Sequence, residues 1–343
     1  AEEAAKKVKV ELEELPAYMS APEAMAEDAI EIHPGTPNVY FETRRVKGED
    51  TKPLMESLPY VVEGDFYVGR QPHLVLEPDV GFAYMDEEDN LIVHSKSIAL
   101  HFHHAMTAEG IGIAPDKYFI VQNPAGGTFG YKFSPTNEAL LGVAALVTKR
   151  PVFLELNMYQ QITYTGKRSP FFIHLKYGAD ENGKLVAMEA DWTIDHGPYC
   201  EFGDLLTMRG TQFIGAGYDI PNSRGVGRTV ATNHAWGSAF RAYGAPQSLF
   251  ATEVLADMMA EKIGMDPLEF RYLNVYREGS TTPTGCPPDV IAFPQALDTL
   301  RSLYKEAKER AKEKNKKGGN IKYGVGISLN MYGCGLDGAD SSE

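Results

Sequence analysis

The sequence predicts a mixed α/β (α+β) fold, and three observations support this prediction. Several stretches alternate apolar and polar residues with turn residues between them, as strands of hairpins do. Other apolar runs begin and end at helix-capping residues, and the 33 glycines and 21 prolines are spread along the chain without a repeat. A length of 343 residues with 43% apolar residues suffices for two or three ordinary domains.

The strongest strand signal is a hairpin over residues 170–195. Ile173, Leu175 and Tyr177 alternate with polar residues, and Asn182-Gly183 has the composition of a tight turn before the alternation resumes. Short apolar runs between 60 and 100 predict further antiparallel strands.

Two predictions concern the beginning of the chain. Residues 8–13 alternate with the same two-residue period and predict a half-buried strand. Residues 17–35 are acidic, contain proline and show no clear period, so we interpret them as a linker from a preceding element.

Four segments carry helix signals. Capping residues, first-turn prolines and terminal glycines predict helices at 139–147 after Ser134-Pro135, from Pro246 to Ile263 before Gly264, after Asp266-Pro267, and from Pro294 to Lys317. The lysines that end the last segment are expected on a solvated helix face.

The charge balance excludes several classes of partner. With 33 basic and 47 acidic residues, the formal net charge is −14, which disfavours binding to nucleic acid or to anionic membranes. No apolar run approaches the roughly 20 residues that span a bilayer, and the amino-terminal residues lack the pattern of a secretory signal. We therefore expect a cytoplasmic protein.

No cluster of side chains predicts a metal bound directly by the protein. Cys200, Cys286 and Cys334 are far apart and form no CxxC pair, so they are interpreted as thiols without a catalytic role. The histidines of the run His101-Phe102-His103-His104 do not share one helix or strand face.

The first informative loop spans residues 124–135 and contains Gly126, Gly127 and Gly130. It follows an apolar strand at 118–121 and leads toward a helix, an arrangement in which backbone amides can bind an anion or an oxo group. The loop has neither the GK[ST] nor the GxGxxG pattern of nucleotide-binding proteins. A simple tight turn remains the alternative.

The second loop spans residues 237–247 and also leads into a helix. Arg241 lies between Phe240 and Tyr243 among small residues, where its side chain or its backbone could face a bound oxygen. A surface arginine in a salt bridge is the alternative. Two amide-rich loops in one chain could converge on a single site.

Three motifs together resemble the molybdenum hydroxylase (xanthine oxidase) family, over essentially the whole chain. They are Gly-Gly-Thr-Phe-Gly-Tyr-Lys at 126–132, Phe-Arg-Ala-Tyr-Gly-Ala-Pro-Gln at 240–247 and Gly-Arg-Gln-Pro-His-Leu-Val-Leu-Glu-Pro at 69–78. Within this family, the sequence most resembles the aldehyde-oxidising members of sulfate-reducing bacteria. The resemblance implies a molybdopterin-binding domain in which the dithiolene of molybdopterin cytosine dinucleotide holds molybdenum, with no protein ligand to the metal.

The resemblance also implies roles for individual residues. Gln71 and Arg241 would be the catalytic residues near the metal's ligands. The cofactor-binding residues would be Gly127, Thr128, Phe129, Gly130, Arg241 and Ala242. Phe133, Phe202, Leu205 and Tyr243 would line the substrate channel, with Arg209 one turn farther if 204–209 is helical. Phe133 stands where purine-hydroxylating relatives have a glutamate, which favours aldehydes as substrates.

The implied reaction oxidises aldehydes to carboxylic acids with oxygen from water, and electrons pass to two [2Fe-2S] clusters outside this chain. The resemblance also implies that the general-base glutamate follows Glu343, and Glu77 within the chain is a weak candidate for that role, so the chain alone is expected to be inactive. We expect it to be a fragment or one of several polypeptides of an enzyme that forms homo-oligomers. The expected division is a tail at 1–20, a first cofactor-binding domain at 21–320 and the start of a second at 321–343.

Two other functions remain open. One is a non-catalytic subunit that holds or assembles the cofactor. The other is an ordinary nucleotide-binding protein without molybdenum.

Overall fold

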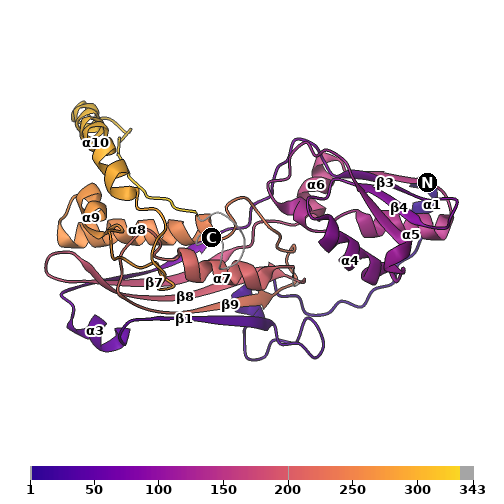
Figure 1. The fold of residues 1–343 in the computed structure, drawn as a ribbon, viewed down its shortest axis with the longest axis horizontal. Coiled ribbons are helices and arrows are strands. Elements are labelled where there is room, and N and C mark those ends of the chain that lie inside the picture. The colour runs from indigo at the N-terminus through magenta and orange to yellow at the C-terminus, as the bar shows by residue number, and fades with distance from the viewer. Residues whose placement is uncertain (1, 200, 333–343) are drawn as a thin grey trace.

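The computed structural model describes residues 2–199 and 201–332, which form two sheet-containing lobes side by side along the long axis (Figure 1). The large lobe contains a five-stranded sheet of order β1-β9-β8-β7-β2, and the small lobe a four-stranded sheet of order β5-β4-β3-β6. The strands are β1 (Val39–Lys47), β2 (Tyr60–Val68), β3 (Val80–Met85), β4 (Leu91–Ser95), β5 (Tyr118–Gln122), β6 (Val152–Glu155), β7 (Phe171–Ala179), β8 (Leu185–Gly197) and β9 (Asn222–Ala231). The predicted mixed α/β class is confirmed.

The small lobe is inserted between two strands of the large one. The chain leaves β2 at Val68, builds β3 to β6 and the small lobe's helices, and returns to the large sheet at Phe171. Residues 69–79 and 165–170 are therefore the two segments that cross between the lobes.

The predicted hairpin at 170–195 is confirmed by β7 and β8, which pair antiparallel. Gly183 in the connecting turn has φ +83°, a left-handed conformation that glycine adopts without steric cost. The next neighbour, β9, runs parallel to β8, so the large sheet is mixed.

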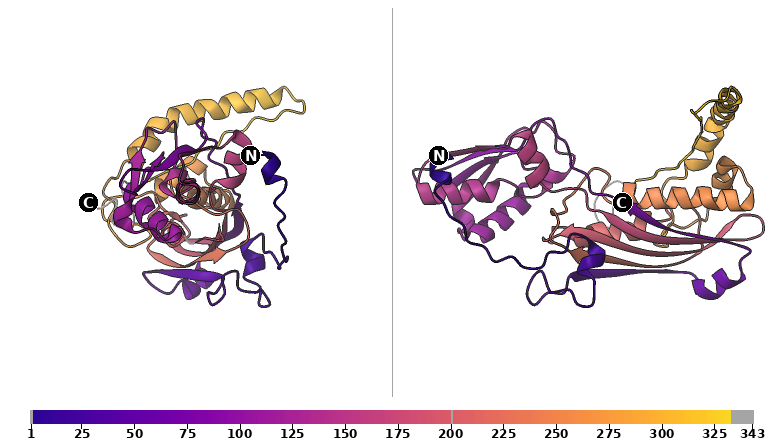
Figure 2. Two further views of the ribbon diagram at one scale, coloured as in Figure 1. Left: turned by 90° about the vertical axis from the view of Figure 1, so that its right-hand side faces the viewer. Right: turned by 180° about the vertical axis from the view of Figure 1, so that it is seen from behind.

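Helices α7 (Gly203–Phe213) and α8 (Ala245–Ile263) cover one face of the large sheet, as the two opposite views in Figures 1 and 2 show. Trp192 of β8 is fully buried beneath α7 and donates a 3.0 Å hydrogen bond to the carbonyl of Thr207. A Cβ atom at Gly210 would lie 2.3 Å from the Trp192 indole nitrogen, so close packing of α7 requires a glycine there.

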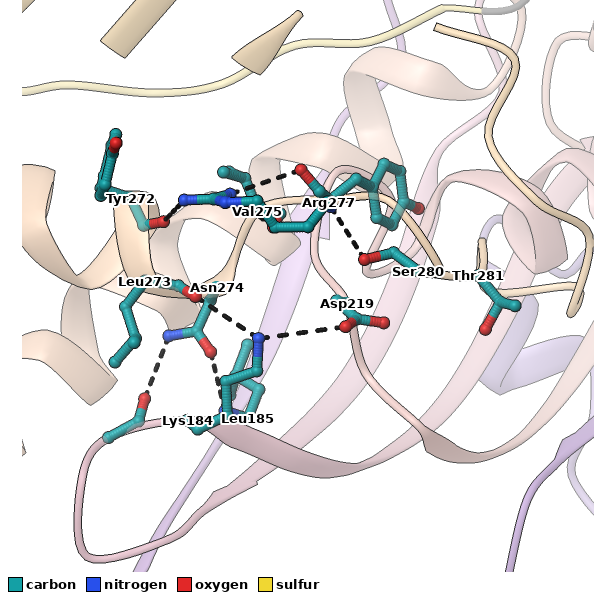
Figure 3. A network of polar contacts seen from close by, with 12 residues as sticks. Lys184, Leu185, Asp219, Tyr272, Leu273, Asn274, Val275, Arg277, Ser280 and Thr281 are labelled. Atoms are coloured by element: carbon teal, nitrogen blue, oxygen red, sulfur yellow. Dashed lines mark hydrogen bonds and ion pairs between the residues drawn. The ribbon is translucent and has the colours of Figure 1, made fainter. Parts of the chain in front are cut away.

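Helix α9 (Pro267–Asn274) fixes the far end of the hairpin. The Asp266 side chain caps it by accepting from the Leu268 amide at 2.8 Å, as predicted. The buried Asn274 side chain donates to the carbonyl of Gly183 at 3.0 Å and accepts from the Leu185 amide at 2.8 Å (Figure 3). These bonds satisfy backbone groups at the turn and join it to the helix.

In the small lobe, α4 (Leu100–Ile111) and α5 (Glu138–Thr148) pack on the sheet, and α6 (Met158–Tyr164) follows β6. Leu91, Val93, Tyr118 and Leu141 are buried in the core between them. The remaining short elements are α1 (Glu2–Ala5), α2 (Ala21–Ala24), α3 (Thr51–Ser57), η1 (Pro115–Lys117) and η2 (Tyr131–Phe133).

Long α10 (Phe293–Lys316) projects from the large lobe and confirms the predicted helix over 294–317 (Figure 1). Helix α8 also begins and ends as expected, with Pro246 in its first turn and a left-handed Gly264 after Ile263. Within residues 2–199 and 201–332, no helix combines the length and apolar character needed to cross a membrane.

One predicted element is absent, and two others differ in detail from the prediction. Residues 8–13 are exposed and outside any strand, because no strand of the described residues pairs with them. Residues 17–35 are mostly irregular, as a linker is, but α2 forms within them and buries Ala21 and Ala24 against Val230. The helix predicted at 139–147 is confirmed by α5, but its cap is Asn137 and not Ser134, because η2 occupies the preceding residues and leaves Ser134 extended.

Candidate functional site

The candidate site lies where the two crossing segments meet the second loop. Gln71 and Arg168, one on each crossing segment, form an isolated antiparallel bridge in which the Arg168 amide donates to the Gln71 carbonyl at 2.9 Å. Lys167, the residue before Arg168, forms an isolated parallel bridge with Gly237 of the second loop. Segments about 70 to 100 residues apart in the sequence thus lie side by side.

The two glycine-containing loops converge at this place. The backbone amide of Arg241 donates to the carbonyl of Phe129 at 2.7 Å. A Cβ atom on Gly130 would lie 2.7 Å from the Ala239 carbonyl oxygen, so the loops could not approach this closely with any other residue there. The sequence indicated that the loops could converge, and the structure brings them together.

Both loops contain non-glycine residues in left-handed conformations. Phe129 has φ +49° and Ala242 has φ +61°, and Gly127, Gly130 and Gly244 also have positive φ. Each non-glycine residue in this region costs about 1–3 kcal/mol, so the surrounding contacts must impose it. No described residue accepts a hydrogen bond from the amides of Phe129 or Ala242. These amides can bind an oxygen-rich ligand.

One detail of the first loop differs from the prediction. Gly130 is followed by the single turn η2, and α5 begins only at Glu138, so no α-helix amino terminus follows the glycines directly. The second loop does lead directly into α8, which begins at Ala245.

The sequence analysis missed Arg168, which joins the segments of the site. Its Nε donates to Gln71 Oε1 at 3.0 Å, its Nη1 to Gln247 Oε1 at 3.3 Å, and its Nη2 to the carbonyl of Arg241 at 3.0 Å. The guanidinium lies 3.9 Å from the centre of the Phe240 ring. A signal was present, because the Lys167-Arg168 pair lies two residues before the buried strand β7.

The site is electropositive. Burial lowers the pKa of Arg168 to about 10, and burial together with nearby Arg70 lowers the pKa of Lys167 to about 8, so both remain largely protonated at neutral pH. Among the described residues, no carboxylate forms a salt bridge with Lys167, Arg168 or Arg241. The Lys167 ammonium donates to the Thr165 carbonyl and Arg168 to neutral oxygens, so no described carboxylate neutralises the charge of the site.

His73 packs against the second loop. Its ring stacks on Phe240 with centroids 4.2 Å apart, and its Nε2 lies 2.8 Å from the carbonyl oxygen of Ala239. Burial lowers the pKa of His73 to about 4, so the imidazole is neutral at neutral pH.

Glu77 supports the first loop. One carboxylate oxygen accepts from Lys96 at 2.7 Å, and the other accepts from the Gly126 amide. The hydrogen bond from Lys96 is the main cause that holds the pKa of Glu77 below its usual range. A carboxylate with both oxygens engaged in this way is better suited to holding the loop than to accepting a proton from a substrate.

Among the residues expected to line a channel, Phe202 contacts both Phe133 and Tyr243. Phe133 and Phe202 have ring centroids 5.2 Å apart, and the Tyr243 hydroxyl donates to the Phe202 carbonyl. Leu205 is half-buried on α7, which confirms that 204–209 is helical. Arg209, buried on the same helix, packs against Gly244 of the second loop.

Phe102 belongs to the same aromatic cluster and was missed. It lies 5.8 Å from Phe133 and 5.6 Å from Phe202 between ring centroids, and it is about half exposed. Because Phe102 comes from the small lobe and Phe202 from the large one, the cluster bridges the lobes.

The histidines beside Phe102 point to different surroundings. His103 is buried 3.6 Å from Glu138, the His104 ring nitrogen lies 2.9 Å from the Tyr118 carbonyl, and His101 is exposed. No three histidines, cysteines or carboxylates of residues 2–199 and 201–332 form a metal site. Cys286 is exposed, and Cys200 and Cys334 lie outside the described residues.

Comparisons with known proteins agree with this geometry. Residues 32–275 match the family described as the molybdopterin cofactor-binding domain. Aldehyde oxidoreductase of Megalodesulfovibrio gigas is 63% identical over 99% of this chain, and the chain spans 37% of that protein. The large molybdopterin subunit of nicotinate dehydrogenase from Eubacterium barkeri is 29% identical over 91% of this chain and 71% of the subunit.

A solved structure agrees as well. Aldehyde oxidoreductase from Desulfovibrio desulfuricans superimposes with a TM-score of 0.94 at 59% identity, covering 98% of this chain and 37% of that one. The resemblance to the molybdenum hydroxylases is thereby confirmed. This chain belongs to the molybdopterin cofactor-binding domain family.

Proposed function

We propose that this chain is part of the molybdenum-binding portion of an aldehyde oxidoreductase, which oxidises aldehydes to carboxylic acids. The observation that carries the proposal is the convergence of the two loops, with the strained residues Phe129 and Ala242 presenting amides that no described residue engages. The 63% identity to a protein named aldehyde oxidoreductase supports the same function.

The residues fit a molybdopterin cofactor. The free amides and the uncompensated charges of Lys167 and Arg168 suit an anionic, oxygen-rich group that needs donors and no side-chain ligand. When bound, the cofactor supplies the two-electron oxidation. In the proposal, Gly127, Thr128, Phe129, Gly130, Arg241 and Ala242 hold it, with Gln71 and Arg241 as the catalytic residues.

The chain's own residues would orient the substrate and exclude water. The ring cluster of Phe102, Phe133 and Phe202 offers an apolar wall to an aldehyde substituent, and Leu205 and Tyr243 extend it in the proposed channel. Preorganised donors at a developing oxyanion contribute about 3–4 kcal/mol each to lowering the barrier, so the two loop amides could supply a large part of a rate enhancement.

We further propose the cytosine dinucleotide form of the cofactor and two [2Fe-2S] clusters, carried by segments of a homo-oligomeric enzyme outside this chain. In this division, residues 21–320 form the first cofactor-binding domain, after a tail at 1–20. Residues 321–343 begin a second one, of which 333–343 lie outside the described residues. The general-base glutamate would come from a segment outside the chain.

An inventory of the native, full-length protein tests the proposal. Purified protein should contain molybdenum and a cytosine dinucleotide in equal amounts, and should reduce a dye in the presence of aldehydes. Protein that folds and holds its iron but contains no molybdenum would refute the assignment. A complete assembly that holds molybdenum but lacks a glutamate near Arg241 would favour a cofactor-holding subunit.

The isolated 343-residue chain is the matched control. It should show no aldehyde-dependent dye reduction, because the proposed base and electron acceptors lie in other segments. Activity of the chain alone would contradict this division of labour.

A further inference from the structure

Arg168 contacts Gln71 on one crossing segment and three residues of the second loop, and it is 6% exposed. We propose that Arg168 is a positioning residue whose guanidinium fixes the direction of two hydrogen-bond donors, the side-chain amide of Gln71 and the backbone amide of Ala242. What these donors bind rests on the proposed function, whereas their orientation follows from the contacts of this chain.

The first donor is the Gln71 side-chain amide. Its oxygen accepts from Arg168 Nε at 3.0 Å, and the backbone bridge between the two residues holds the side chains next to each other. A carboxamide presents its oxygen and its NH2 group on opposite sides. With the oxygen turned toward Arg168, the NH2 group of the exposed Gln71 side chain points away from it as a donor.

The second donor is the Ala242 backbone amide. Arg168 Nη2 donates to the carbonyl of Arg241 at 3.0 Å, and that carbonyl belongs to the same peptide plane as the Ala242 N–H. In a planar trans peptide the C=O and N–H bonds point in opposite directions. Arg168 therefore turns the Ala242 N–H away from itself, in a residue that already has φ +61°.

Only an arginine matches this arrangement. Its three nitrogen donors reach Gln71, Gln247 and Arg241 at once, and the guanidinium plane packs over Phe240 at 3.9 Å. A lysine would bring the same charge as a single ammonium group, without the planar fork.

The first experiment determines the orientation of the 241–242 peptide and does not depend on an activity measurement. Crystal structures of the full-length protein would be compared for wild type, Arg168→Met and Arg168→Lys. We expect the 241–242 peptide to flip in Arg168→Met, because the Arg241 carbonyl loses its donor, and to become mixed in Arg168→Lys, because one ammonium group cannot reach all three acceptors that the guanidinium reaches. An unchanged carbonyl direction in the variants would overturn the proposal, and the lysine variant provides the answer if the methionine variant does not fold.

The second experiment reads turnover per bound molybdenum in the full-length protein. Arg168→Met should lower kcat about 100-fold, the size of effect that loss of a preorganised donor produces, and Arg168→Lys about ten-fold. In a Gln71→Leu background the loss caused by Arg168→Met should shrink to about ten-fold, because one of its two targets is already gone. Independent, multiplicative losses would refute a role through Gln71.

Arg45 provides a matched control. It is equally buried, donates to the carbonyls of Thr211 and Ile214 at 2.9 and 2.8 Å, and lies 5.9 Å from the Trp192 ring, away from the loops. Arg45→Met should lower the unfolding midpoint and leave kcat per molybdenum unchanged. If the wild-type protein held no molybdenum, the proposed function would fail, and the direction of the 241–242 peptide would still test Arg168.

Discussion

Two regions of this molecule bury arginines in opposite ways. Between α8 and α9, the fully buried Arg271 bonds Glu253 at 2.9 Å and Asp257 at 2.7 Å. Where the lobes meet, Arg168 bonds only neutral oxygens and has Lys167 next to it in the chain.

The pKa values follow this difference. Burial alone would lower the pKa of Arg271, but Tyr218, Glu253 and Asp257 outweigh it and raise the pKa. The pKa of Arg168 falls to about 10 because burial has no opposing carboxylate. In a chain with 14 more acidic than basic residues, carboxylates were available for pairing. The cations at the lobe junction have no carboxylate partner, which favours the binding of an anionic ligand there. The ion pairs of Arg271 between α8 and α9 instead support the fold.

The largest expected effect is on the paired region. Arg271→Met should destabilise the full-length protein by about 3–5 kcal/mol, because it leaves the Glu253 carboxylate buried without its counter-charge. Urea unfolding followed by circular dichroism measures the loss. Arg301→Met is the control, because its partly exposed ion pair with Glu269 should contribute less than about 1 kcal/mol. Equal losses would remove the distinction between the buried and exposed pairs.

At the junction, the largest effect is expected from Gly130→Ala. The added Cβ atom would collide with the Ala239 carbonyl and separate the two loops, and a displacement of about 1 Å at a reacting centre costs about 100-fold in turnover. Aldehyde-dependent dye reduction, normalised to molybdenum, measures it in the full-length protein.

Gly264→Ala is the control that separates backbone strain from a steric collision of the added Cβ atom. Gly264 also has positive φ, +78°, but no atom lies within 4 Å of its ideal Cβ position. This variant should lose about 1 kcal/mol of stability and keep its turnover. A similar loss of turnover in both variants would mean that the contact between the loops is not what matters.

A third prediction concerns Asp79, a junction carboxyl group whose ionisation is disfavoured by burial. Burial raises the pKa of Asp79 from 3.8 to about 6, against an opposing hydrogen bond from Thr136. The folded state therefore holds its proton more tightly than the unfolded state, and the associated stability is present below pH 4 and lost as the pH rises to about 6. Asp79→Asn should abolish this loss.

The measurement is the free energy of unfolding against pH. Relative to wild type, Asp79→Asn should gain on the order of 3 kcal/mol between pH 4 and 7, and nothing more above pH 7. Parallel curves for the two proteins would show that Asp79 ionises normally in the folded state.

Much of the fold could be predicted because its signals are local. The alternation and Asn182-Gly183 turn specify β7 and β8, and Pro246 and Gly264 delimit α8. Residues 8–13 carry the same alternation but lack a partner strand in the described residues, and the sequence does not encode a partner locally.

The residues of the candidate site also divide into those that the sequence predicts and those that it does not. The glycines of both loops are visible in the sequence, because close backbone approach requires glycine. The basic Lys167-Arg168 pair is visible too, but the role of Arg168 is not, because it depends on pairing with Gln71, 97 residues away, and with the Arg241 loop, 73 residues away. Phe102 likewise joins the aromatic cluster only through the packing of α4.

The smallest expected effect sharpens the comparison by placing a carboxylate at the junction. Phe133→Glu should lower kcat/KM for aldehydes about ten-fold, because the new charge loses water beside Phe102 and Phe202 and repels an apolar substituent. The loss should grow with the size of the aldehyde. Phe133→Leu, which keeps the wall apolar, should retain most activity at normal molybdenum content. Unchanged kinetics of the glutamate variant across aldehydes of different size would remove Phe133 from the channel and leave the loop amides as the site's defining feature.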